Sequence, residues 1–137
     1  MSYSKKISLT GRTRRLIEVA KKTAEKSPAP DYRHGALLVK GNSIVGSAYN
    51  KNSFNRWGNR FRHRDCGHAT HHAELGCILG KDRSVTTGAT IYVVRIGKKG
   101  EFRMSKPCPM CEAVMRHVGI KKVVYTINDE EVGVHKL

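Results

Sequence analysis

Four residues in two short segments have the types and spacing of a catalytic metal site. His72 and Glu74 lie two positions apart in "HAE", and Cys108 and Cys111 lie three positions apart in "PCPMC". A catalytic zinc ion takes three nitrogen or sulfur ligands from the protein and keeps a fourth position for water. His72, Cys108 and Cys111 supply such a set. Glu74 is near enough to His72 to transfer protons without binding the metal.

Other roles for the cysteine pair stay open from the sequence. A CxxC pair can be a thiol-redox pair, but the aromatic-Cys-Gly-Pro-Cys pattern of such pairs is absent here. A purely structural zinc site needs a fourth protein ligand. The segment "HRDCGHATHH" offers candidates for that ligand and also for a second, structural zinc ion: Cys66, His68 and His71. The alternative is that these side chains are ordinary surface groups.

A long polar segment, residues 50–70, interleaves aromatic and basic side chains. Its candidates for substrate contact are Trp57, Arg56, Arg60 and Arg62. Aromatic rings stack on bases, and arginines bind phosphates. The whole chain has 26 Lys and Arg against 11 Asp and Glu, a net charge of +15. This excess favours a polyanionic partner such as single-stranded DNA or RNA over a single phosphorylated nucleotide. A solvated basic surface is the alternative.

The rest of the sequence predicts the elements that position these residues. Apolar spacing and turn residues indicate, in chain order, a helix over 11–26, a hairpin over 34–50, a helix over 71–79, a strand over 89–96, a helix over 108–118 that Ser105 caps and Gly119 ends, and a strand over 121–127. Cys77 is expected to be a buried thiol. Helices between the later strands favour parallel pairing. We therefore expect one domain, residues 1–137, with a three-layer α/β/α fold and a mixed, mostly parallel sheet of about five strands.

The "HAE" and "PCPMC" motifs together resemble those of the zinc-dependent cytidine and deoxycytidylate deaminase superfamily, and the similarity covers most of the chain. The resemblance implies a cytidine-deaminase-like fold, one catalytic zinc ion, and Glu74 as the proton carrier. It also implies that Asn50 touches the sugar or base, that Ala36 lines the base pocket, and that the Ala73 backbone meets the base edge. Since relatives of this kind often form dimers or tetramers, the resemblance also implies a homo-oligomer, at least a dimer.

The predicted function is hydrolytic conversion of cytosine to uracil on single-stranded nucleic acid. A free-nucleotide deaminase acting on dCMP or CMP is the next hypothesis, because a single phosphate needs only one or two cations. The segment "AYNKNSFN" and Gly76 depart from the deoxycytidylate deaminase pattern. The "CPMC" pair is also similar to tRNA adenosine deaminases, and a non-catalytic, zinc-stabilised nucleic-acid-binding module is the alternative from another class. No apolar run of membrane-helix or signal-peptide type occurs, so a cytoplasmic or nucleus-accessible protein without a membrane partner is expected.

Overall fold

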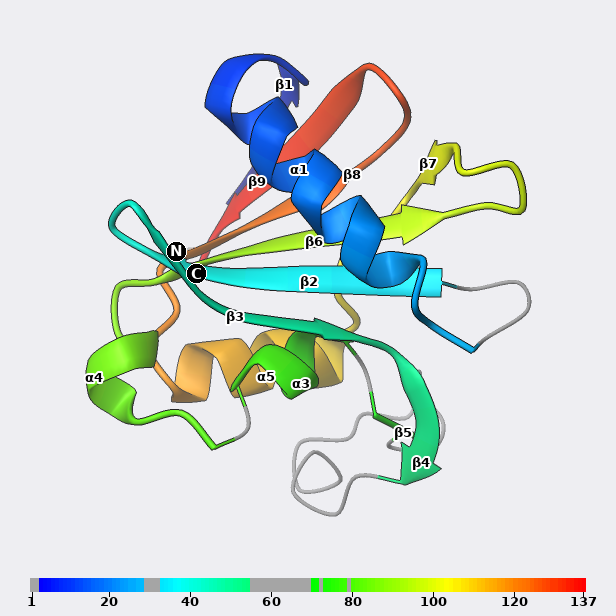
Figure 1. Cartoon of the computed structure of the whole chain (residues 1–137). Coiled ribbons are helices and arrows are strands. Elements are labelled where there is room, and N and C mark those ends of the chain that lie inside the picture. The colour runs from blue at the N-terminus through cyan, green and yellow to red at the C-terminus, as the bar shows by residue number, and fades with distance from the viewer. Residues whose placement is uncertain (1–2, 29–32, 55–69, 72, 79) are drawn as a thin grey trace.

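The computed structural model describes residues 3–28, 33–54, 70–71, 73–78 and 80–137 (Figure 1). The elements follow in the order β1 (Tyr3–Ser8), α1 (Gly11–Ala24), β2 (Arg33–Lys40), β3 (Ser43–Tyr49), β4 (Lys51–Phe54), β5 (Thr70–His71), α3 (Ala73–Ile78), α4 (Arg83–Thr86), β6 (Thr90–Ile96), β7 (Phe102–Arg103), α5 (Pro109–His117), β8 (Lys122–Thr126) and β9 (Glu131–Lys136). None of the helices within these ranges combines the length and the apolar character that crossing a bilayer would take.

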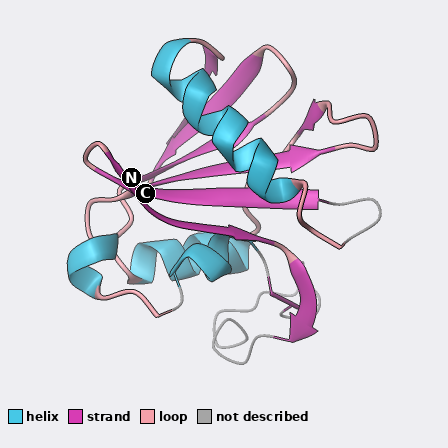
Figure 2. Ribbon diagram, viewed as in Figure 1, coloured by secondary structure: helices cyan, strands magenta, loops and turns pink. Residues whose placement is uncertain are grey.

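The strands form one large sheet and one small ribbon. The large sheet has seven strands in the order β1-β9-β8-β6-β2-β3, with β7 paired to β6. Within the described strands, β6 and β8 are the parallel pair, and every other pair is antiparallel. β4 and β5 form the separate two-stranded ribbon. Figure 2 shows the large sheet as a row of strands with helices on either side.

The expectation of a mostly parallel sheet with about five strands is wrong. A helical crossover joins β6 to β8 and gives the parallel pair, but short connections can join only antiparallel neighbours. The connection between β8 and β9 is such a turn, in which the Asn128 Oδ1 accepts hydrogen bonds from the backbone N–H groups of Glu130 and Glu131 at 2.8 and 2.9 Å. The segment that contains α3 also connects two strands that run in the same direction, β3 and β6. These strands do not form a parallel pair, because β2 lies between them and pairs antiparallel with both.

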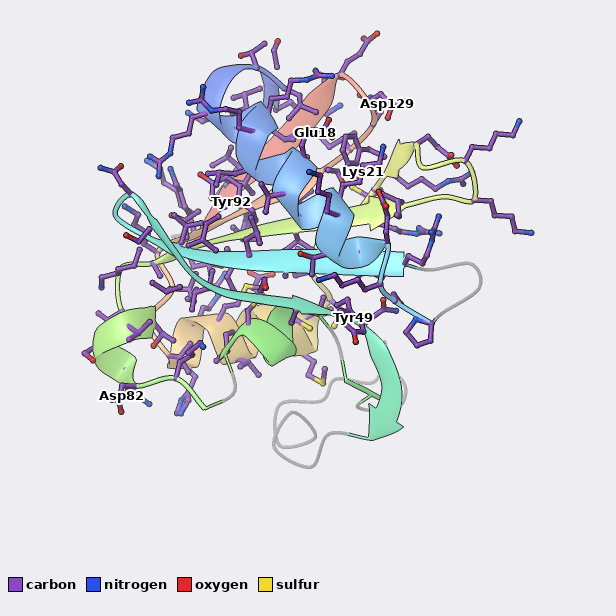
Figure 3. All side chains as sticks on the ribbon, in the orientation of Figure 1. Glu18, Lys21, Tyr49, Asp82, Tyr92 and Asp129 are labelled. Atoms are coloured by element: carbon purple, nitrogen blue, oxygen red, sulfur yellow. The ribbon has the colours of Figure 1, made fainter. Side chains whose placement is uncertain are left out.

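Both faces of the sheet are buried beneath helices. Along β6, Ile91 and Val93 join the core cluster formed with α3 and α5, whereas Tyr92 and Val94 join the cluster formed with α1. Figure 3 labels Tyr92 on the α1 side. This alternation follows from the two-residue period of a strand. It explains why the inner strands β2, β6 and β8 are largely apolar, since a strand covered on both faces has no solvent-facing side.

Gly35 on β2 lies directly beneath α1. A methyl group at this position would come 2.3 Å from the carbonyl oxygen of Ala20 and 2.7 Å from the backbone nitrogen of Ala24. We expect Gly35→Ala to lower the free energy of unfolding by about 1–3 kcal/mol, because helix backbone cannot move aside as a flexible side chain does. Urea denaturation measures this. Ser47→Ala, on exposed β3, is the control and should change stability by less than about 0.5 kcal/mol; equal stabilities for the two variants would contradict the close contact.

Candidate active site

The two cysteines of the CxxC motif lie at the start of α5. Cys108 is the residue that precedes the first helical position, with extended backbone angles (φ −71°, ψ 164°), and its carbonyl accepts a hydrogen bond from the Glu112 N–H at 3.0 Å. Pro109 takes the first helical position, which the fixed φ of proline suits. Cys111 is fully buried, and Cys108 is half-buried. Both thiols therefore point from a single helical turn.

The separation of the two sulfur atoms fits zinc. The Sγ atoms of Cys108 and Cys111 are 3.7 Å apart. Two sulfurs bound to one tetrahedral zinc ion at about 2.3 Å each would be about 3.8 Å apart. The pair therefore matches two corners of a zinc tetrahedron without rearrangement. Its position at a helix N-terminus also favours the anionic form of such ligands.

The start of α3 lies in the same part of the core. Ala73, the first residue of α3, is fully buried in the cluster that also contains Met110 and Cys111. Glu74 is the next residue of α3. His72 and the side chain of Glu74 lie outside the described residues. In the described ranges, no group of three or more His, Cys, Asp or Glu side chains forms a metal site, so the roles of His72 and Glu74 stay predictions.

Other predicted contacts also fall outside the described part of the chain. They are Cys66, His68, the side chain of His71, Arg56, Trp57, Arg60 and Arg62. The backbone of His71 is described and pairs with Lys51 in the β4–β5 ribbon. Since β4 follows Asn50 and β5 precedes α3, the ribbon connects the end of β3 to the candidate site.

Asn50 is fixed to β2 through its side chain. Its Oδ1 accepts hydrogen bonds from the Ser27 hydroxyl at 2.6 Å and from the His34 N–H at 2.9 Å, and its own N–H donates to the His34 carbonyl at 3.3 Å. Figure 3 labels the preceding residue, Tyr49, near the start of β4. The side-chain oxygen of Asn50 is thus engaged with the fold, and a substrate contact would use the amide nitrogen.

Removing this side chain should affect both stability and substrate binding. We expect Asn50→Ala to lower the free energy of unfolding by about 1–3 kcal/mol, because it removes the Oδ1 acceptor of the partly buried His34 N–H and of the Ser27 hydroxyl, which keeps its hydrogen bond to the Asn50 carbonyl at 3.1 Å. Ser27→Ala should cost less and should leave KM for the substrate unchanged, whereas Asn50→Ala should raise it. Urea denaturation and steady-state kinetics measure the two effects. An equal KM for both variants would contradict a substrate contact by Asn50.

A pair of buried hydroxyl groups holds the segment that leads to the CxxC motif. The Ser105 hydroxyl donates to the Val93 carbonyl at 2.9 Å and accepts from the Thr126 N–H at 2.8 Å. The Thr126 hydroxyl donates to the Arg103 carbonyl at 2.7 Å. The prediction that Ser105 caps the following helix is wrong, because its hydroxyl binds β6 and β8 and α5 begins at Pro109. Ser105 instead anchors the loop from which Cys108 projects.

Glu112, which follows Cys111, ties α5 to β9. Its Oε1 accepts a hydrogen bond from Arg116 and lies 3.1 Å from the Nε2 atom of His135. Burial raises the pKa of the Glu112 carboxyl, but the hydrogen bonds and charges of Arg116 and His135 outweigh burial, and the pKa lies below its ordinary value. The carboxylate is therefore ionised at neutral pH and holds the helix that carries both cysteines against the sheet.

The sequence prediction left out two basic residues close to Asn50 and Ser105, namely His34 and Arg95. Arg95 is the one charged residue of β6, and its backbone N–H donates to the Thr126 hydroxyl at 3.3 Å. A single arginine within an apolar strand is a signal in the sequence, since charged residues are seldom buried without a partner. Whether the Arg95 side chain lies beside the candidate site depends on the face of the sheet from which it projects, and the sequence alone does not determine that face.

Comparison with known proteins identifies the same region. The family model described as "Cytidine and deoxycytidylate deaminase zinc-binding region" matches residues 11–127. This span runs from the start of α1 to just beyond β8 and includes the "HAE" and "PCPMC" motifs. No curated protein matches the sequence.

Solved structures share the fold at low sequence identity. The dCMP deaminase from the cyanophage S-TIM5 in apo form has a TM-score of 0.60 and 20% identity, over 83% of this chain and 81% of that chain. Its complex with dCMP and dUMP has a TM-score of 0.58 and 21% identity, over 82% of this chain and 78% of that chain. RibD from Acinetobacter baumannii, form 1, has a TM-score of 0.53 and 18% identity, over 83% of this chain and 27% of that chain. These likenesses establish a cytidine-deaminase-like α/β fold.

Proposed function

We propose that this chain, which belongs to the cytidine and deoxycytidylate deaminase family, hydrolyses the C4 amine of a free cytosine nucleotide, with deoxycytidylate as the first candidate substrate. The observation that carries the proposal is the 3.7 Å separation of the Cys108 and Cys111 sulfurs at the start of α5. The buried start of α3 at Ala73 lies in the same core cluster. The likeness to a cyanophage dCMP deaminase, whose structure is known with dCMP and dUMP, supports the choice of substrate.

The exposed cations of α1 give no support to a single-stranded nucleic acid substrate. Arg12, Arg14, Arg15 and Lys22 are exposed on α1. Helix α1 packs on one face of the sheet, and α3 and α5 pack on the other (Figure 1). A strand that entered the site at Cys108 would therefore not meet these cations on the same face. The net charge of +15 alone is then a weak argument for a polynucleotide substrate.

The proposed mechanism assigns a task to each residue. Cys108 and Cys111, with His72, would hold zinc, which supplies a Lewis acid that lowers the pKa of a bound water molecule to about 7. Glu74 would accept one proton from the attacking water and deliver it to the ring nitrogen N3, and would then carry the second proton, from the hydroxyl now on C4, to the departing amine. Cytosine and water thereby become uracil and ammonia.

The remaining assigned residues act on the position of the base. Asn50 orients the sugar or base through its amide nitrogen. The fully buried Ala36 and Ala73 form walls of the base pocket. Small side chains at both positions leave room for a flat ring close to the backbone.

A substrate comparison tests the proposal. The zinc-loaded protein is incubated with dCMP, CMP, deoxycytidine and a single-stranded oligonucleotide, and products are identified by mass and by ammonia release. We expect kcat/KM for dCMP to exceed the value for oligonucleotide cytosine by at least about 100-fold, a difference of about 2.7 kcal/mol in transition-state stabilisation. Deamination of the oligonucleotide without deamination of dCMP would instead support the single-stranded nucleic acid hypothesis, which the arginine-rich segment 56–64 favours.

A further inference from the structure

The outer side of α1 carries a row of cations that we call the basic ridge. Ile17, Ala20 and Ala24 are buried against the sheet, so the opposite side of the helix faces solvent. Residues three and four positions apart are neighbours on a helix surface. The exposed residues that follow this spacing include Val19 and four basic residues, Arg12, Arg15, Lys22 and Lys26. Since the Lys26 N–H bonds to the Thr23 carbonyl at 3.1 Å, the helical course of the chain extends past Ala24, and the ridge runs the whole length of α1.

The charge of the basic ridge is not neutralised by ion pairs. Within the described part of the chain, the ion pairs involve carboxylates next to β7 and on α5, and none includes a residue of α1. Glu18 and Glu25 are seven positions apart and therefore share one flank of the helix, beside the ridge. Figure 3 labels Glu18 on α1. Arg12 donates a hydrogen bond to the Gly41 carbonyl at 3.0 Å, which leaves its positive charge in place.

The basic ridge and the candidate active site lie on opposite sides of the sheet (Figure 1). The buried side of α1 packs in one core cluster, whereas Cys111 and the start of α3 pack in the other. A polyanion bound to the ridge would therefore occupy a different surface from a nucleotide bound near the cysteine pair. The ridge also accounts for positive charge that a single nucleotide does not require, in a chain with a net charge of +15.

The chemistry of the ridge selects among polyanions. Helix α1 contains no aromatic residue, so it lacks the stacking surfaces on which single-stranded nucleic acid binds. Its apolar side is buried in the core, so it does not offer the apolar face that an amphipathic helix inserts into lipid. Guanidinium and ammonium groups bind phosphates without reading the sequence of bases. A DNA duplex fits these features, because its major groove admits an α-helix and is bordered by phosphates on both sides.

We propose that the basic ridge of α1 is a docking surface for double-stranded DNA, which it binds through the phosphate backbone and without sequence specificity. The free energy of this binding comes chiefly from the release of counterions, so the affinity falls steeply as salt rises. The inference goes beyond the proposed function and does not depend on it, since duplex binding requires neither zinc nor turnover.

Fluorescence anisotropy with a short labelled DNA duplex tests the docking surface. The ridge variant combines Arg15→Gln and Lys22→Gln. The matched control combines Lys6→Gln and Lys81→Gln, which removes the same charge from two other exposed positions. Lys6 precedes Ile7, which packs on the α1 side, and so projects from the opposite face of the sheet. Lys81 follows α3, and its N–H bonds to the Ile78 carbonyl.

The two variants should differ in affinity and in salt dependence. At about 0.1 M salt, the ridge variant should bind the duplex about 10- to 100-fold more weakly than the native protein, and its slope of log K against log salt should be shallower by about 2. The control should stay within about threefold of the native affinity and keep the native slope. Arg15→Gln alone should give a smaller loss and a slope shallower by about 1. Excess dUMP should leave duplex binding unchanged.

Four results would overturn the docking surface. Equal losses for the ridge variant and the control would show that total charge, rather than the ridge, determines binding. Release of the duplex by dUMP would place the DNA at the candidate active site. Tighter binding to one strand of the same sequence than to the duplex would assign binding to stacked bases. Binding to vesicles of anionic phospholipid, without binding to the duplex, would make the ridge a membrane-surface contact.

Discussion

Glu74→Gln should lower kcat for deoxycytidylate by about 100- to 10,000-fold while zinc content and thermal stability stay unchanged. Glutamine preserves the size and hydrogen-bonding capacity of the side chain but cannot carry a proton between water, ring nitrogen and leaving amine. Glu74 belongs to the first turn of α3, whose start is buried beside Met110 and Cys111. Glu74 is therefore carried by a helix whose first residue packs in the same core cluster as Cys111.

Steady-state ammonia release and zinc analysis of the purified variant measure this outcome. Glu25→Gln is the control, since Glu25 is an exposed carboxylate at the end of α1, on the opposite side of the sheet, and should keep the native kcat. A Glu74→Gln variant with kcat within about threefold of the native value would remove Glu74 as the proton carrier. A variant that lost zinc together with activity would assign Glu74 to the metal site.

Cys111→Ser should release zinc and lower kcat/KM by at least about 1,000-fold, equivalent to about 4 kcal/mol of transition-state stabilisation. Cys111 is fully buried, and its sulfur is 3.7 Å from the sulfur of Cys108. A serine hydroxyl is a poor zinc ligand at neutral pH because it stays protonated, whereas a thiol ionises readily near a metal. Thermal stability should also fall, since bound metal stabilises the folded state by mass action.

Cys77→Ala is the matched control for this prediction. Cys77 is fully buried in the same core cluster as Cys111, as expected from the sequence, and its thiol donates to the Ala36 carbonyl at 3.2 Å. Its loss should cost stability through a small cavity but should leave one zinc ion per chain. Zinc retained at full occupancy by Cys111→Ser, or lost by Cys77→Ala, would contradict the assignment of the ligands.

The geometry of the cysteine pair was predictable from the sequence because its two residues are close together in the chain. Cys108 and Cys111 are separated by one helical turn, so their spacing alone brings the sulfurs together. The end of their helix was predictable for the same reason. Gly119 has φ +84°, and the N–H of the next residue, Ile120, bonds to the Met115 carbonyl at 3.0 Å, a closure that favours glycine after a helix.

Features that depend on distant partners were not predictable from the sequence. Ser105 binds Thr126, 21 positions away, and no local pattern distinguishes that role from a helix cap. The strand β9 has few apolar residues, and its pairing with both β8 and β1 depends on a turn held by Asn128. The sheet is therefore more antiparallel than the alternation of helices and strands indicates.

Net charge is also limited as evidence for a binding partner, because the positions of the charges depend on the fold. The composition predicts an affinity for polyanions, but it does not say which face carries the cations. In the structure, α1 carries a large share of the exposed basic residues among the described elements. Arg95, by contrast, is the one charged residue of β6 and lies on the other face of the sheet.

Zinc-dependent release of ammonia from deoxycytidylate is the most direct test of the central claim. The purified protein is stripped of metal with a chelator, reloaded with one equivalent of zinc per chain, and assayed for conversion of dCMP to dUMP by mass spectrometry. We expect no turnover in the stripped protein and full turnover after reloading. A folded protein that binds zinc stoichiometrically and yet releases no ammonia from dCMP, CMP, deoxycytidine or an oligonucleotide would contradict the account and indicate a zinc-stabilised binding module.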